Sequence, residues 1–224
     1  MRLLLAKPHS PEHYEARRGR VTGSVADVIV GGTAHAWNKL ADQIRSGDAS
    51  LGGLENVPSI AWGNKHEPMA RGEFWSRHPE LDIETPAFAY YWNDQDPLFA
   101  STLGFSPDFV LLDQPEGQPK GGQVKCPYNP ANHEGYIQAG VCPPDYFAQV
   151  QFEMFCANSP SWYFISFDPR ETDPERRYFE VVVPRDPAFV EDLEAKLIKF
   201  IGGLRSGERF LPPTRNATTL NAAF

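Results

Sequence analysis

A short apolar segment, a turn and a second short segment that begins with two glycines dominate the middle of the sequence. The first covers residues 109–112 and directly follows Asp108, and the second covers residues 121–126. The seven residues between 113 and 121 include two prolines and a glycine, which are residue types that interrupt regular structure. This pattern predicts a β-hairpin with strands over 108–113 and 121–126.

Polar residues of this hairpin can meet at one point. Because side chains alternate along a strand, Gln123 and Lys125 share one face and Val124 takes the other. The hairpin can bring Asp108 opposite them, so that a carboxylate, an amide oxygen and an ammonium group converge. An Asp followed by an (Asp/Glu)-x-Lys element is typical of Mg-dependent nucleases, and Gln123 stands where the second acid is expected.

Length and charge limit the possible organisation and partners. The 224 residues suffice for one folded domain, which we expect over 1–205, followed by a polar tail over 206–224. Proteins that grip duplex DNA over a broad face are usually basic, whereas this chain has a net charge of −8. Any contact with DNA is therefore expected to be local, unless a closed ring holds the DNA by topology.

The sequence also predicts a cytoplasmic protein that makes no contact with a membrane. No apolar run is long enough to span a bilayer, and the apolar core of the first residues is too short for a secretory signal. The three cysteines are odd in number and lack the spacing of a metal site, which indicates reduced thiols.

Hydrophobic periodicity predicts an α/β fold with the site at a strand edge, because helices precede and follow the strands. Ser24 and Asp27 resemble a capping box at a helix start, and Pro68 predicts a kink or break within a long helix. A glycine-rich loop is expected over 46–56. The expected helices cover residues 13–18, 24–30, 33–45, 58–78, 130–139, 144–157 and 189–204, and the expected further strands cover 85–92, 98–103, 162–168 and 177–183.

Six spaced motifs occur in one order along the chain, over residues 17–24, 61–67, 106–108, 124–127, 146–151 and 162–170. They read RRGRVTGS, AWGNKHE, SPD, VKCP, YFAQVQ and WYFISFDPR. Together they resemble the lambda-type exonuclease branch of the PD-(D/E)XK nucleases, which includes alkaline exonucleases and YqaJ-like viral recombinases. The resemblance extends over roughly residues 17–204.

This resemblance implies a restriction-endonuclease-like core, with a central mixed sheet flanked by helices. It implies a 5′→3′ exonuclease that digests linear double-stranded DNA from 5′-phosphorylated ends and leaves 3′ single strands. Two Mg²⁺ ions per site are implied, for which Mn²⁺ can substitute. A homotrimer ring threaded by DNA and a single-strand annealing protein are the implied partners.

The resemblance also assigns roles at the metal site. Asp108 is the bridging ligand, and the Gln123 side chain and the Val124 main-chain carbonyl complete the first metal. Glu67 is a further acid that approaches from the long helix, although an acid on the helix surface is the alternative. Lys125 orients the attacking water or helps to deprotonate it.

Other matched positions form the expected substrate contacts. Arg17, Ser24 and Ser106 correspond to a pocket for the 5′-phosphate, which the helix start at Ser24 would favour. Capping of the helix is the alternative role of Ser24 and is compatible with the pocket, and a surface salt bridge is the alternative for Arg17.

Tyr146 and Gln149 lie one helical turn apart, so both can face the site. Gln149 matches a residue that helps to position Lys125, whereas Tyr146 could also be a core residue. Ile60 matches an apolar wedge that separates the terminal base pair, with a core role as the alternative.

Gln123 is the one departure from this pattern, because most relatives have Glu at the matching position. The change removes a negative charge and is expected to lower metal affinity. A DNA-end-binding variant with weak or no nuclease activity therefore stays open as an alternative. An endonuclease on the same fold is a separate alternative, independent of Gln123.

Overall fold

The predicted hairpin lies in the middle of a five-stranded sheet. The computed structural model describes residues 1–47 and 57–212. In it, strands β5 (Phe109–Leu111) and β6 (Gly121–Lys125) pair antiparallel. The sheet order is β2-β5-β6-β7-β8, in which only β6 and β7 are parallel, and this confirms the expected mixed sheet. The other strands are β2 (Ile83–Glu84), β7 (Ser161–Phe167) and β8 (Tyr178–Pro184).

Two adjacent glycines permit the close packing at the start of β6. A Cβ atom on Gly121 would lie 2.6 Å from the Trp162 ring and 2.7 Å from the carbonyl oxygen of Phe109. At Gly122 a Cβ would collide with the Phe109 ring itself. Aromatic rings can therefore cross the strand here, and Phe109 pairs directly with Gly122.

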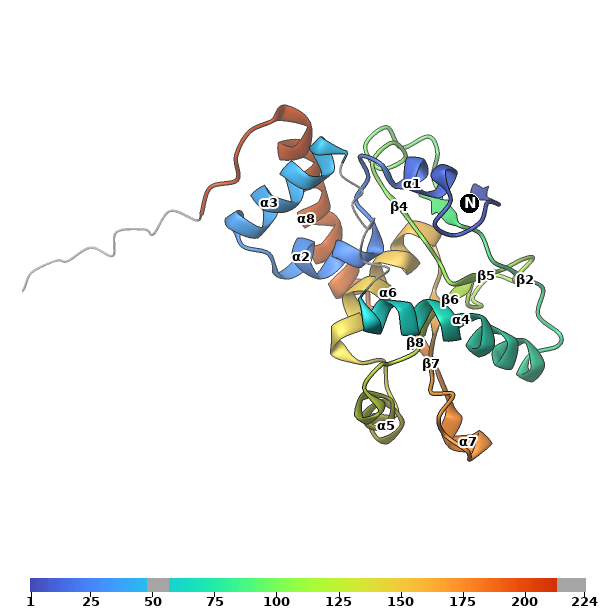
Figure 1. Ribbon diagram of the computed structural model, residues 1–224. Coiled ribbons are helices and arrows are strands. Elements are labelled where there is room, and N and C mark those ends of the chain that lie inside the picture. Colours follow the sequence, from blue (N-terminus) through green and yellow to red (C-terminus); the bar gives the residue numbers. More distant parts are fainter. Residues whose placement is uncertain (48–56, 213–224) are drawn as a thin grey trace, which may run out of the picture.

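Helices cover both faces of the sheet (Figure 1). On one face, Ala70 and Phe74 of α4 (Pro58–Arg77) join a core with Phe109, Val124 and Ile165. On the other face lies α6 (Pro144–Ala157), whose apolar residues share a core with alternate positions of β7. The side-chain alternation of the strands thus supplies two separate cores.

A helical layer lies beside the sheet, where Figure 1 shows α2, α3 and α8 gathered together. Trp37 packs edge-on against Phe200 and Phe210, at 5.6 and 5.0 Å between ring centroids. The first described residues after α8, up to 212, therefore dock on this layer, and the rest of the expected tail lies outside the described residues. These helices are α2 (Ala26–Gly31), α3 (Ala34–Ser46) and α8 (Pro187–Ser206).

Smaller elements complete the fold. A second sheet contains β1 (Leu3–Leu4), β3 (Phe88–Tyr90) and β4 (Gly104–Phe105) in the order β1-β3-β4. The remaining helices are α1 (Pro11–Arg17), the 3₁₀ turn η1 (Gly23–Val25), α5 (Pro130–Ala139) and α7 (Pro174–Arg177). None of the helices within the described residues is long and apolar enough to cross a membrane.

The prediction of a strand over 98–103 is wrong. The Asp96 carboxylate accepts hydrogen bonds from the main-chain N–H groups of Leu98 and Phe99, which starts a turn. The main-chain N–H of Leu103 then bonds to the carbonyl of Phe99, as in a helix. The local capping by Asp96 outweighs the apolar composition of the segment, and the strand begins only at Gly104.

Two other local predictions differ from the structure. The expected capping box is wrong, because η1 precedes α2 and the cap position of α2 is Val25, without a side-chain cap. The Ser24 hydroxyl turns toward Thr22 and Arg17 instead. Helix α4 continues through Pro68, so the predicted break does not occur. The expected loop over 46–56 lies largely outside the described residues.

Candidate active site

A cleft of about 600 Å³ opens between α4, the hairpin and the helices that follow it. Five of the six sequence-predicted metal and catalytic residues line this cleft, although they are up to 58 positions apart in the chain. The lining includes Ile60, Glu67, Asp108, Gln123, Val124, Lys125 and Tyr146. The hairpin and the two flanking helices therefore place these seven residues around one space.

Asp108 is held at the entry of β5 by its neighbours on β6. Its Oδ2 atom accepts hydrogen bonds from the Gln123 side-chain amide and from the Val124 main-chain N–H, each at 2.5 Å. Burial and, after it, the negative charge of Glu67 together raise the pKa of Asp108 to about 7, against the opposing effect of Lys125. A carboxylate in this setting favours a nearby positive charge.

Gln123 belongs to a chain of side-chain hydrogen bonds. The Gln149 amide nitrogen donates to the Gln123 amide oxygen at 2.7 Å and to Glu153 Oε1 at 2.9 Å. The Glu153 side chain is nearly inaccessible, with 1% exposure, and its burial raises its pKa to about 8. Glu153 was not predicted as a site residue; its only signal in the sequence is its spacing of four from Gln149 on one helix.

Lys125 of β6 and Glu67 of α4 both line the cleft. The Lys125 ammonium is 3.5 Å from the Gln149 amide oxygen and lies over the Tyr146 ring, 4.8 Å from its centroid. Glu67 forms an ion pair with Arg71, one turn along α4. Lys125 is therefore oriented by both residues of α6 that the sequence placed on the site-facing side.

The oxygen atoms in the cleft fit a hard divalent cation. The Asp108 and Glu67 carboxylates and the Val124 carbonyl are the ligand types that Mg²⁺ prefers. Within the described residues, however, no three His, Cys, Asp or Glu side chains are grouped as a metal site. Gln123 stands where the sequence pattern predicted an acid, and its amide nitrogen, not its oxygen, faces Asp108.

A cluster of hydroxyl groups, named here the Arg17 pocket, surrounds the Arg17 guanidinium, and its member Ser106 lies two residues before Asp108. The Arg17 guanidinium donates to Ser106 at 2.8 Å and more weakly to Thr22 and Ser24, at 3.4 and 3.5 Å. His13 also contacts Ser106, at 2.9 Å. The structure thus brings the three predicted residues together, and Arg17 forms no ion pair with any residue that the structure describes. Sequence reasoning missed Thr22 and His13.

A family comparison identifies the domain. The sequence pattern of the YqaJ-like viral recombinase domain matches residues 12–160, well over half of the chain. The chain belongs to this family. The family resemblance drawn from the six motifs is therefore confirmed. No curated protein sequence matches the chain.

Solved structures share the fold of this YqaJ-like domain. The alkaline exonuclease LHK-Exo from Laribacter hongkongensis has 22% sequence identity and a TM-score of 0.71, covering 88% of this chain and 94% of LHK-Exo. LHK-Exo in complex with dAMP gives 23% and 0.72 over the same shares. A phage-related exonuclease from Haemophilus somnus 129PT has 14% identity and a TM-score of 0.56, covering 87% of this chain and 98% of that one.

Arg170 fixes the loop that forms the cleft wall after β6. Its guanidinium donates to the carbonyls of Pro127 and Tyr128 and forms an ion pair with the buried Asp168. The same group lies over the Trp62 ring of α4, at 4.5 Å. This one side chain therefore connects the end of β7 to the loop after β6 and to α4. These contacts stabilise the wall of the cleft in the YqaJ-like domain.

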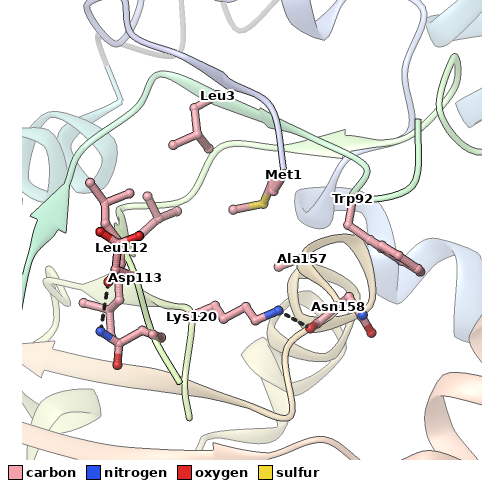
Figure 2. A pocket seen from close by; sticks show the side chains of 11 residues that line it. Met1, Leu3, Trp92, Leu112, Asp113, Lys120, Ala157 and Asn158 are labelled. Carbon is pink, nitrogen blue, oxygen red and sulfur yellow. Dashed lines mark hydrogen bonds between the residues drawn. The ribbon is translucent and has the colours of Figure 1, made fainter. Parts of the chain in front are cut away.

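A second cleft, of about 420 Å³, lies at the opposite end of the hairpin (Figure 2). Figure 2 shows Lys120 reaching the carbonyl of Asn158, to which it donates at 2.9 Å. The single carboxylate in its lining is Asp113. The residue types that hydrolyse a phosphodiester are therefore concentrated in the first cleft, at the Asp108 end.

Proposed function

We propose that the chain is a Mg²⁺-dependent exonuclease that digests linear double-stranded DNA in the 5′→3′ direction from 5′-phosphorylated ends. The observation that carries this proposal is the convergence of Asp108, Glu67 and Lys125 on one cleft beside the Arg17 pocket. The product would be a 3′ single strand available for recombination by annealing.

The chemistry requires an attacking water, a stabilised phosphorane and a neutralised leaving oxygen. Divalent ions, when bound, would supply charge neutralisation and a water of lowered pKa. Asp108, Glu67 and the Val124 carbonyl would hold them, and Mn²⁺ is expected to substitute for Mg²⁺. Lys125, oriented by Gln149 and Tyr146, would position the attacking water.

The Arg17 pocket would select the end of the strand. Ser106 contacts Arg17 directly and lies two residues before Asp108, so the pocket and the acid are held at a fixed separation. A guanidinium surrounded by hydroxyl groups matches a phosphate, which accepts hydrogen bonds from both. Ile60 lines the cleft that contains Asp108 and would contact the terminal base pair as an apolar wedge.

The relatives support this proposal. The structures that share the fold are named exonucleases, and one of them holds the nucleotide dAMP. As a member of a viral recombinase family, the chain is proposed to act as a homotrimer ring beside a single-strand annealing protein. A ring would also reconcile DNA binding with the net charge of −8, since enclosure does not depend on a basic surface.

Digestion of linear and closed circular duplexes tests the proposal. We expect Mg²⁺-dependent release of nucleotides from linear DNA, faster from 5′-phosphorylated than from 5′-hydroxyl ends, and no release in EDTA. Labels at the 5′ and 3′ ends would establish the direction. Cutting of closed circles would instead identify an endonuclease and would refute the exonuclease proposal.

The orientation of Gln123 favours one alternative function. Its amide nitrogen donates a hydrogen bond to the Asp108 carboxylate, which stabilises that carboxylate without a cation. Metal binding would then be weaker, and the protein would bind DNA ends without cutting them. Tight binding of 5′-phosphorylated ends without nucleotide release in Mg²⁺ or Mn²⁺ would support this end-binding function. Restoration of cleavage by Gln123→Glu would then locate the cause at this residue.

A further inference from the structure

His13 is a buried histidine that the proposed chemistry does not use. It lies on α1, has 5% exposure, and its Nε2 atom is 2.9 Å from Ser106 Oγ. The chain separation of 93 residues shows that this contact depends on the tertiary fold. A buried histidine held against a hydroxyl of the phosphate pocket can control the direction of the hydrogen bonds made by that hydroxyl.

The position of the imidazole proton follows from the second ring nitrogen. His13 Nδ1 lies 2.8 Å from the main-chain N–H of His9, which can only donate. A neutral His13 must therefore carry its proton on Nε2 and donate it to Ser106 Oγ. Burial and, after it, the charge of Arg17 together lower the pKa of His13 to about 4, so the ring is neutral near pH 7.

Ser106 can then make one further hydrogen bond, as a donor. Its oxygen has two lone pairs, and these accept from His13 and from Arg17, at 2.9 and 2.8 Å. The hydroxyl hydrogen has no acceptor among the residues that the structure describes. It is available for an incoming group, and that group must be an acceptor of hydrogen bonds.

We propose that His13 is a specificity-determining positioning residue, which makes Ser106 an obligate hydrogen-bond donor and so selects a terminal phosphate over a terminal hydroxyl. The inference rests on the proposed 5′-phosphate pocket. A phosphate oxygen accepts the Ser106 hydrogen bond without needing to donate. A 5′-hydroxyl oxygen can accept the same bond, but it carries no charge and its own hydrogen finds no free lone pair on Ser106, so it gains less than a phosphate.

The local backbone supports this role. His9 has a left-handed backbone conformation, with φ of 62°, which is uncommon outside glycine. In this conformation its N–H group faces His13 Nδ1, and Ser10 next to it caps α1 through its side chain. The turn before α1 thus fixes the tautomer of His13.

Two substitutions test the roles of the two ring nitrogens separately. His13→Asn places its amide near the position of Nδ1, so it can still accept from His9 but cannot reach Ser106. His13→Gln extends to the position of Nε2 and can still donate to Ser106. Affinities for a duplex with a 5′-phosphate and for one with a 5′-hydroxyl are measured in EDTA, which prevents cleavage, and thermal unfolding confirms that each variant is folded.

We expect the ratio of the two affinities to fall about threefold to tenfold in His13→Asn and to stay near the wild-type value in His13→Gln. In a Ser106→Ala background, His13→Asn should cause no further change, because the shared partner is already absent. Arg17→Ala serves as the control that disables the pocket.

The outcomes distinguish this inference from the proposed function. If the wild type discriminates and Arg17→Ala does not, but His13→Asn keeps the wild-type ratio, the role of His13 is refuted and the pocket stands. An equal loss in His13→Asn and His13→Gln also refutes it, since the donor would then be irrelevant. A wild type that does not discriminate refutes the phosphate pocket itself.

Discussion

Replacing Gln123 by glutamate tests whether this position faces a cation. In the structure the amide nitrogen of Gln123 lies 2.5 Å from Asp108 Oδ2 and supplies it with a hydrogen bond. A glutamate would put a carboxylate oxygen at that place. Two carboxyl groups in contact cannot both ionise easily, so the metal-free variant should be less stable than the wild type.

The magnitude follows from the lost bond. A hydrogen bond to a charged group contributes roughly 1.5–3 kcal/mol, which corresponds to a fall in Tm of about 3–12 °C for a domain of this size. Metal binding should reverse the effect, because the variant offers an additional negative ligand. At a Mg²⁺ concentration about 100-fold above Kd, binding adds about 2.7 kcal/mol.

Thermal unfolding of both proteins in EDTA and in Mg²⁺, followed by circular dichroism, measures both effects. The pH should lie above the value of about 7 at which Asp108 titrates. Gln151→Glu is a matched control. Gln151, on α6, is buried as Gln123 is, but its side chain bonds to the main chain of Pro184 and Asp186. It should lose stability without recovery in Mg²⁺. If Mg²⁺ stabilises Gln123→Glu no more than the wild type, residue 123 does not face the metal.

Three further predictions concern other parts of the domain. Arg17→Ala should reduce the preference for 5′-phosphorylated ends about 10- to 100-fold, because charged hydrogen bonds are lost; equal digestion rates on the two substrates would show this, and an intact preference would contradict it. The unfolded chain releases the Glu153 proton above about pH 4.5 whereas the folded protein keeps it to about pH 8, so wild-type stability falls over this range. Glu153→Gln should make that decline shallower, with the remaining part due to Asp108; an equally steep loss of stability with pH in both proteins, measured by urea unfolding, would refute it. Gly121→Ala should lower the free energy of unfolding by about 1–3 kcal/mol, because its Cβ would meet Trp162 and the carbonyl of Phe109; an unchanged urea midpoint would argue against this packing.

Local signals in the sequence were sufficient for much of the fold. Helices α5 and α6 begin and end at the predicted residues, because each starts with a proline in its first turn and is followed by a residue with positive φ. The segment over 98–103 was mispredicted because its apolar composition suits a strand, while the deciding interaction is the Asp96 side chain at its start. Composition alone does not reveal that competition.

Site residues could be predicted from the sequence only where they belong to a recognisable motif. Asp108 and Lys125 occur in a recognisable spacing, and the hairpin places them at one end of the sheet. His13 and Glu153 have no such spacing. Their partners become visible only when segments distant in the sequence pack together, as in the contact of His13 with Ser106.

The contacts of Asp108 and those of Arg17 differ in how far apart along the chain their partners lie. Asp108 and Gln123 are 15 residues apart, so their contact forms with the hairpin, whereas Arg17 and Ser106 are 89 residues apart. Closing the longer loop costs more chain entropy, and such contacts form late in folding and open first. The domain can therefore lose end selection by local opening of its N-terminal segment while the hairpin with Asp108 stays folded. Hydrogen exchange would show this as faster exchange in α1 than in β6.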